Sequence, residues 1–286
     1  MHQIITYSDR VPYTIAEQIA ELTRQNCTDL SMLGVPQSST VYPLYQYTLS
    51  TEILMYVHRV GTYEQEAPVR LVVAFSDGTQ KTVIGFVLYL PVITDRQACG
   101  LTYMTVASGH RRNGVARDMM DAVAKACPHI ELTCFISKVP VYEGMGFRVI
   151  GYRDTQIIMN NRTDPSAGEM AALHLDPIYK SPEFTLVQDR LMQKHGIKAI
   201  KDDERKVIRV AGELKRKAEQ YALSRAEEIV RYRRPNATVA EVSPGLFELQ
   251  GVDGVVCQSS DESEVWIEAV KLMNIRNEAV KRVVHV

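Results

Sequence analysis

Cysteine is scarce in this chain of 286 residues, with five cysteines that are scattered along it and form no Cys-x-x-Cys pair. An odd and sparse set argues against a disulfide framework and against a zinc site, so we expect no bound metal. Cys134 lies in an apolar run and is expected to be a small core residue. These cysteines predict a reducing compartment, the cytoplasm.

Long hydrophobic runs are also missing, since none approaches the roughly 18 residues that a membrane helix needs. The first residues show no basic segment followed by an apolar one, so we expect no signal peptide and no membrane partner. The formal net charge is -1, which gives no global field to attract nucleic acid. Hydrophobic residues make up 45% of the chain, as in ordinary globular proteins of one or two domains.

What is present over residues 1–160 is an alternation of strand and helix patterns. Apolar runs predict strands, and apolar spacings of three and four predict helices. An Asp77-Gly78 turn is expected between the second and third strands. The pattern predicts an α/β domain with a central mixed sheet flanked by helices. The expected strands are 3–7, 69–75, 81–91, 101–107, 131–136 and 148–159, and the expected helices are 14–24, 50–58, 115–126 and 140–146.

The remaining residues have a different character. Residues 161–235 predict a linker and a long charged helix, with one helix over 184–195 ending at Gly196 and a second over 202–234. Residues 236–286 predict a small α+β module. Its expected strands are 239–242, 246–249 and 255–257, and its expected helix is 262–273.

The stretch from His110 to Ala116 lies between an expected strand and an expected helix and contains Gly114. Such a turn leaves backbone N–H groups unpaired at the positive end of the helix. That arrangement binds a phosphate or a diphosphate.

This turn resembles motif A of the GNAT acyltransferase superfamily, Gln/Arg-x-x-Gly-x-Gly/Ala after a strand, here Arg111-x-x-Gly114-x-Ala116. One strand later, Tyr142-Glu143-Gly144-Met145-Gly146-Phe147 is similar to the Tyr-Glu-x-x-Gly-Phe signature of the same family. The resemblance covers about residues 1–160. It implies a GNAT-like sheet and an N-acetyltransferase that moves an acetyl group from acetyl-CoA to an amine by direct attack.

The resemblance also implies roles for individual residues. The backbone of the turn would bind the diphosphate of acetyl-CoA, and the preceding strand would pair with the pantetheine arm and polarise the thioester carbonyl. Tyr142 would protonate the departing CoA thiolate. The implied acetyl-CoA residues are Met104, Thr105 and Val106 in the strand and Arg111, Arg112, Asn113, Gly114, Val115 and Ala116 in the turn.

The chain departs from the family pattern in two places. Ser108 stands where the family often has proline, and the Asn-x-x-Ala segment that precedes the tyrosine is missing. The general base is left open among Glu131, Asp95 and His110. The acceptor is left open as well, with residues 28–47 and 94–100 expected to form its site.

Plainer interpretations stand beside this one. The turn is also compatible with a strand–helix connection that carries surface arginines, and Tyr142 with a packing residue. A second hypothesis is a non-catalytic interaction protein that binds a partner through its C-terminal extension, with Leu214, Ala218, Tyr221 and Ile229 as a docking stripe.

A third hypothesis is acylation of an amine on a nucleic acid, through the basic helix. Residues 180–234 hold fifteen Lys and Arg and nine Asp and Glu. Because the acids and bases are interspersed, the pattern favours a solvated face with ion pairs such as Glu213–Lys217 over a nucleic-acid contact.

Overall fold

A computed structural model describes residues 2–62, 68–76, 82–280 and 283–285. The chain divides into two compact units. The first consists of Met1–Pro128, Glu169–Ala211 and Val283–Val286, and the second of His129–Gly168 and Gly212–Arg282. The domain boundaries at residues 160 and 235 stay a prediction.

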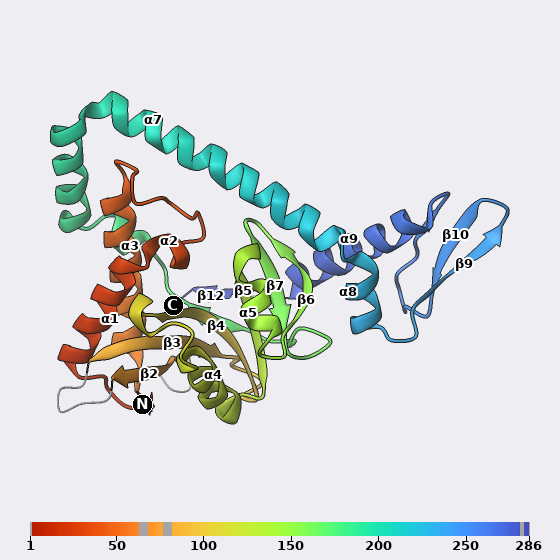
Figure 1. Ribbon diagram of the computed structural model, residues 1–286, viewed down its shortest axis with the longest axis horizontal. Helices are drawn as coiled ribbons and strands as arrows, with labels where there is room; N and C mark the ends of the chain where they lie inside the picture. Colours follow the sequence, from red (N-terminus) through yellow and green to blue (C-terminus); the bar gives the residue numbers. More distant parts are fainter. Residues whose placement is uncertain (1, 63–67, 77–81, 281–282, 286) are drawn as a thin grey trace. The chain divides into compact units, whose positions relative to one another are not determined.

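The first unit contains four antiparallel strands in the order β1-β2-β3-β4. Figure 1 shows α1 and α3 on one side of these strands and α4 on the other. The elements are β1 (His2–Tyr7), α1 (Tyr13–Gln25), α2 (Cys27–Leu30), α3 (Tyr42–Arg59), β2 (Arg70–Ser76), β3 (Val83–Pro91), β4 (Ala98–Val106) and α4 (Val115–Ala126).

Every residue of β3 is buried, as its apolar run predicts for a strand covered on both faces. Alternate residues such as Phe86 and Leu88 join the core formed with α1 and α3. On the opposite face Gly85 lies against α4, where an added Cβ would come within 3.1 Å of the Met119 methyl group. The sheet therefore places the end of β4 and the start of α4 on a well-packed scaffold.

The start of α3 differs from the prediction, which placed it at Ser50 or Thr51. The helix begins at Tyr42 and has Pro43 in its first turn. Proline is tolerated there because backbone N–H groups of the first turn have no partner within the helix. The hydroxyl of Ser50 donates to the carbonyl of Gln46 at 2.7 Å, one turn back in the helix. A residue read as a cap is therefore an interior residue whose hydroxyl is satisfied by its own helix.

The second unit contains strands in the order β5-β7-β6, namely β5 (His129–Cys134), β6 (Arg148–Arg153) and β7 (Gln156–Asn160). The single strand expected over 148–159 was wrong. A two-residue turn at Asp154, with φ of 49°, reverses the chain and makes a hairpin. Between β5 and β6 lie the 3-10 turn Ile136–Lys138 and α5 (Val139–Glu143), which has Pro140 in its first turn as predicted.

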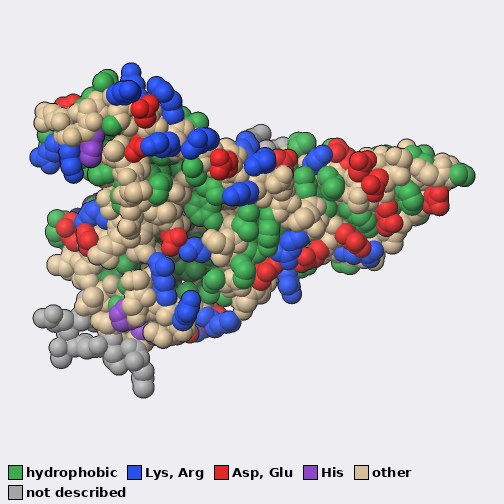
Figure 2. Space-filling model, turned by 45° about the horizontal axis from the view of Figure 1, so that its top comes forward, with side chains coloured by type: hydrophobic (Ala, Val, Ile, Leu, Met, Phe, Trp, Pro, Cys, Tyr) green, Lys and Arg blue, Asp and Glu red, His purple; other side chains and the backbone are tan. Residues whose placement is uncertain are grey.

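Helix α7 (Pro182–Leu223) is interrupted at Gly196, which has φ of 76° and ψ of 150°. The predicted break at this glycine is confirmed, but the long second helix ends at Leu223 and α8 (Ala226–Arg233) follows. Acidic and basic side chains are interspersed along the charged helix in Figure 2. The ion pairs of α7 among the described residues are Asp202–Arg205, Asp203–Lys206 and Lys215–Asp154, and the expected Glu213–Lys217 pair is not among them.

The C-terminal module consists of a three-stranded sheet and a helix. Its elements are β9 (Thr238–Ser243), β10 (Leu246–Gln250), β11 (Gln258–Ser259) and α9 (Glu262–Val280). The third strand lies after the predicted 255–257, and the helix runs beyond the predicted 273. Trp266 is buried, as expected for the core of this module.

Three short elements complete the chain: β8 (Met170–Ala172), α6 (Asp176–Tyr179) and β12 (Val283–His285), with β12 parallel to β8. The turn expected at Asp77-Gly78 lies outside the described residues. Among the helices that are described, none is long and apolar enough to cross a membrane. The predicted fold class, α/β with a central mixed sheet flanked by helices, is confirmed.

Candidate active site

The turn between β4 and α4 has a strongly bent backbone. A 3-10 turn (Ser108–His110) follows β4, and Arg112 then adopts φ of 65°, a left-handed conformation that non-glycine residues rarely adopt. Gly114 caps α4 with φ of 80° and ψ of -11°. These angles turn the chain from the strand into the first turn of the helix within a few residues.

Five successive backbone N–H groups face no acceptor in this turn. Within the described part of the chain, no group accepts a hydrogen bond from the N–H of residues 112–116, and the helical ladder begins with the Asp118 N–H on the Gly114 carbonyl at 3.0 Å. Buried or bound groups normally find partners, so a run of free donors at a helix N-terminus is suited to an anion. The positive end of the twelve-residue α4 adds to this preference.

The side chain of Arg111 forms hydrogen bonds within the protein. Its Nε donates to the Val106 carbonyl at 3.0 Å, and a terminal nitrogen donates to Asn26 Oδ1 at 2.6 Å. The same nitrogen lies 3.5 Å from Asp29 Oδ2. Arg111 thus fixes the end of β4 to the junction of α1 and α2.

Gly114 meets two requirements at once. Its positive φ is the conformation that glycine adopts without strain, and an added Cβ would meet no protein atom within 4 Å. The space beside Gly114 is therefore open among the described residues, and a larger side chain there would occupy part of it.

Strand β4 carries Met104, Thr105 and Val106, which pair with β3 opposite Val87, Phe86 and Gly85. The register shifts just before this segment, where Leu88 pairs with Tyr103 and Tyr89 pairs with Leu101. Thr102 is the extra residue of the resulting β-bulge, which bends the strand locally. Met104, Thr105 and Val106 follow this bulge and pair with β3 in continuous register.

Tyr142 lies in the second unit, in α5, with 8% of its surface exposed. Its ring packs edge-on against Phe147, with 6.0 Å between ring centroids. Burial raises the pKa of its phenol, and the thiol of Cys134 raises it further. Gly146, with φ of 94°, ends this segment and lets the Phe147 N–H bond back to the Tyr142 carbonyl at 3.1 Å.

The three residues considered as a general base have different surroundings. Asp95 is exposed and accepts the backbone N–H of Gln97 at 3.0 Å, which stabilises its own turn. Glu131 is 3% exposed in β5, where it accepts the backbone N–H of Ser166 and lies 3.7 Å from His129. His110 is half-buried beside the turn.

A carboxylate that the sequence reasoning missed is Glu52 in α3. The hydroxyl of Tyr103, in β4, donates to Glu52 Oε1 at 2.8 Å. The signal in the sequence was its place among the buried residues Leu49, Ile53 and Tyr56, where helical spacing puts a glutamate on the apolar face.

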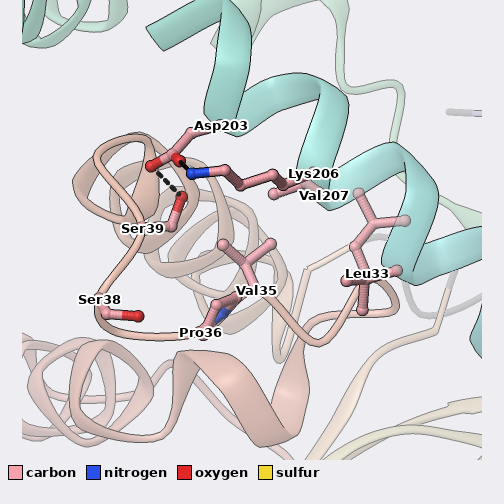
Figure 3. A pocket seen from close by; sticks show the side chains of 9 residues that line it. Leu33, Val35, Pro36, Ser38, Ser39, Asp203, Lys206 and Val207 are labelled. Atoms are coloured by element: carbon pink, nitrogen blue, oxygen red, sulfur yellow. Dashed lines mark hydrogen bonds and ion pairs between the residues drawn. The ribbon is translucent and has the colours of Figure 1, made fainter. Parts of the chain in front are cut away.

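The segment expected to surround the acceptor, residues 28–47, borders a pocket of about 160 Å³. Figure 3 shows Leu33, Val35 and Pro36 from this segment facing Val207 of α7. At its rim Asp203 accepts the backbone N–H of Thr40 at 2.7 Å. Helix α7 therefore holds the loop in place.

Comparison with known families assigns the segment that contains the turn and Tyr142. Residues 38–147 match the family described as the Acetyltransferase (GNAT) family. This part of the chain is a GNAT acetyltransferase domain, and the class of protein that it defines is an acyltransferase. The resemblance found in the motifs is thereby confirmed. A comparison with curated proteins gives no match.

Solved structures that match part of this chain include an aminoglycoside 6'-N-acetyltransferase complexed with coenzyme A, at 15% identity over 57% of this chain and 98% of that chain, with a TM-score of 0.40. A GNAT-family acetyltransferase from Staphylococcus aureus Mu50 matches at 15% identity over 56% of this chain and 98% of that chain, with a TM-score of 0.37. Nourseothricin acetyltransferase matches at 21% identity over 32% of this chain, with a TM-score of 0.29, and this chain covers 64% of its length, less than two thirds. The family assignment rests on the family match to residues 38–147.

Proposed function

We propose that this protein transfers the acetyl group of acetyl-CoA to an amine by direct attack of the nitrogen on the thioester. The observation that carries the proposal is the run of free backbone N–H groups over residues 112–116, at the N-terminus of α4. Such a run, next to a glycine in the left-handed region, binds the diphosphate of a nucleotide cofactor.

The donor would be held in two places. The backbone of Arg111, Arg112, Asn113, Gly114, Val115 and Ala116 would bind the diphosphate. The backbone of Met104, Thr105 and Val106 would pair with the pantetheine arm as an added strand pairs with a sheet edge. An N–H of this strand would polarise the thioester carbonyl, because a fixed donor stabilises the negative charge that develops on the oxygen.

Tyr142 is proposed as the acid that protonates the CoA thiolate as it leaves. Burial raises the pKa of the phenol, which supports this role because the proton stays on the oxygen throughout the neutral range. The C–S bond breaks, and the sulfur takes the proton of the hydroxyl.

The compartment and the partners are part of the same proposal. All five cysteines are free and buried, which supports a reducing compartment such as the cytoplasm. The proposal names the acceptor only as an amine and the partner of residues 161–286 only as a protein. Ala218 and Ile229 of the expected docking stripe are fully buried within this chain, so they offer no surface to a partner.

Calorimetry with acetyl-CoA tests the donor site. We expect binding by the native chain and its loss in Gly114→Glu, because the new carboxylate would fill the space and repel the diphosphate. Gly212→Glu is the matched control, since it adds the same charge at an exposed helical glycine whose Cβ would also meet nothing within 4 Å. Failure of the native chain to bind acetyl-CoA would overturn the proposal. Binding without release of CoA thiol in the presence of amines would instead support the non-catalytic hypothesis.

A further inference from the structure

We propose that Glu52 binds the ammonium group of the acceptor and takes its proton, so that the acceptor is a primary amine that arrives as a cation. This inference rests on the proposed acetyl transfer and adds the residue that receives the ammonium group and its proton. Neither the motifs nor the family match assigns that residue.

The position of Glu52 is the first argument. Its carboxylate is held by Tyr103, which immediately precedes Met104, the first of the three β4 residues proposed to pair with the donor. The bond uses Oε1, and no residue in the described ranges donates to Oε2. One carboxylate oxygen is therefore fixed while the other is left to receive an N–H donor.

The competing carboxylates are engaged in local structure. Asp95 accepts a backbone N–H of its own turn, and Glu131 accepts the backbone N–H of Ser166. Glu52 bonds instead to a side-chain hydroxyl on a neighbouring element, at a helix position that packing would normally give to an apolar residue. Burying a carboxylate at such a position costs free energy of desolvation. A functional role would explain why a glutamate stands there despite this cost.

The groups around Glu52 are aromatic. Tyr103 faces it from β4, and Tyr56 lies one turn further along α3. Burial raises the pKa of the Tyr179 phenol in α6, and the nearby charge of Glu52 raises it further. Tyr56 is fixed, since its hydroxyl accepts the backbone N–H of Leu173 at 3.0 Å. Tyr179 is 51% exposed and gives this cluster a face toward solvent. A carboxylate with aromatic rings around it suits an alkylammonium ion, which rings and anions both attract.

The protonation of Glu52 fits the same role. Burial raises the pKa of its carboxyl, and the hydrogen bond from Tyr103 offsets part of that rise. Among the described carboxyl groups with a resolved shift, all others are lowered. A base whose pKa lies nearer to neutrality accepts a proton from an amine more readily.

The chemical step balances. Glu52 takes one proton from the ammonium ion and passes it to water, and the free amine forms a bond from nitrogen to the carbonyl carbon. The C–S bond then breaks, the nitrogen gives its second proton to water, and Tyr142 protonates the thiolate sulfur and recovers its own proton from water. The net result is an amide, CoA thiol and one proton released to solvent.

The direct test is a pH titration followed by carbon-13 NMR. The full chain carries carbon-13 in its glutamate carboxyl groups and is saturated with CoA, the product that acetyl-CoA leaves. The Glu52 resonance is the one that disappears in Glu52→Gln. Adding n-butylammonium should lower the pKa read from this resonance, because a bound cation stabilises the carboxylate. The neutral analogue n-butanol should leave it unchanged. If n-butylammonium leaves the pKa read from the Glu52 resonance unchanged, the proposal is overturned.

Kinetics with n-butylamine and 1,4-diaminobutane supply the second readout. Glu52→Gln should lower kcat/KM by about 100-fold, as loss of a general base does, with acetyl-CoA binding unchanged in calorimetry. Tyr103→Phe should move the acid limb of the pH–rate profile to higher pH, because it removes a hydrogen bond that lowers the pKa of Glu52. A purely structural role would not move that limb. Glu183→Gln, which removes an exposed carboxylate at the start of α7, is the control that should behave as the native chain.

These outcomes separate two failures. If the native chain does not bind acetyl-CoA, the proposed function fails. If it binds acetyl-CoA and Glu52→Gln retains the native rate and pH profile, only the role of Glu52 fails.

Discussion

Arg225 donates a 2.6 Å hydrogen bond to Glu143, the residue that follows Tyr142 in α5. The same guanidinium binds Glu228 through two nitrogens, at 2.9 and 2.8 Å, and donates to the hydroxyl of Tyr221 at 3.0 Å. These contacts raise the pKa of Arg225, chiefly through Glu228. A residue of the C-terminal extension therefore fixes the segment that carries the proposed acid.

Replacing Arg225 should weaken this segment. We expect Arg225→Ala to lower the free energy of unfolding by about 1–3 kcal/mol, because Glu143 would keep a partly buried charge without its charged partner. Urea unfolding followed by the fluorescence of Trp266, the only tryptophan, measures the change in this unit. Lys215→Ala is the control, since its ion pair with Asp154 is exposed and should contribute little. Equal effects of the two substitutions would contradict this account.

The two glycines of the β4–α4 turn should respond differently to alanine. Gly114→Ala should lower the melting temperature, because a left-handed residue with a Cβ costs roughly 1–2 kcal/mol. It should also weaken acetyl-CoA binding, since the methyl group enters the open space beside Gly114. Gly109→Ala, in the same turn but outside the left-handed region, should change neither quantity. Thermal unfolding and calorimetry on both variants check this, and a native-like Gly114→Ala would count against the proposed diphosphate site.

Local patterns predicted the part of the fold that local chemistry determines. Helix α4 runs over the predicted residues Val115–Ala126 because a glycine precedes it and Pro128 follows it. The break at Gly196 was predicted for the same reason, since only glycine adopts its φ of 76° readily. The hairpin between β6 and β7 was missed because its turn uses Asp154, with neither glycine nor proline to mark it.

The contacts that define the candidate site depend on residues far apart in the sequence. Glu52 and Tyr103 meet across 51 positions, and Arg111 reaches Asn26 across 85. Spacing within one helix or one strand contains no information on such pairs, because packing between elements decides them. The sequence therefore predicted the backbone turn that is proposed to hold the donor and missed the side chain that is proposed to receive the acceptor.

Tyr142→Phe should separate catalysis from binding. The substitution removes one oxygen and keeps the ring that packs on Phe147, so the fold and acetyl-CoA affinity should be unchanged. Loss of a general acid should lower kcat by about 100-fold with n-butylamine as acceptor. Because the pKa of the phenol is raised, no alkaline limb below pH 9 should come from Tyr142 in the native profile. Tyr152→Phe, which loses a 3.2 Å bond to Glu219, is the matched control. An unchanged kcat in Tyr142→Phe would remove the residue from its proposed role.

Asp203 should hold the loop before α3 even in mild acid. Its carboxylate pairs with Lys206 at 2.9 Å and accepts the Thr40 N–H, and both contacts keep its pKa well below the usual range. A lowered pKa means that the contribution is present above the unfolded value of about 4 and is lost only as the pH falls through the folded value. Hydrogen exchange should therefore show a constant protection factor at Thr40 from pH 6 to pH 3.5 in the native chain, and a low one in Asp203→Ala at every pH. Asp202→Ala, which removes an exposed 3.3 Å contact with Arg205, should keep Thr40 protected. Loss of native protection between pH 5 and pH 4 would show that the carboxylate titrates as a free aspartate. Unchanged protection in Asp203→Ala would show instead that the loop is held by its apolar contacts with α7.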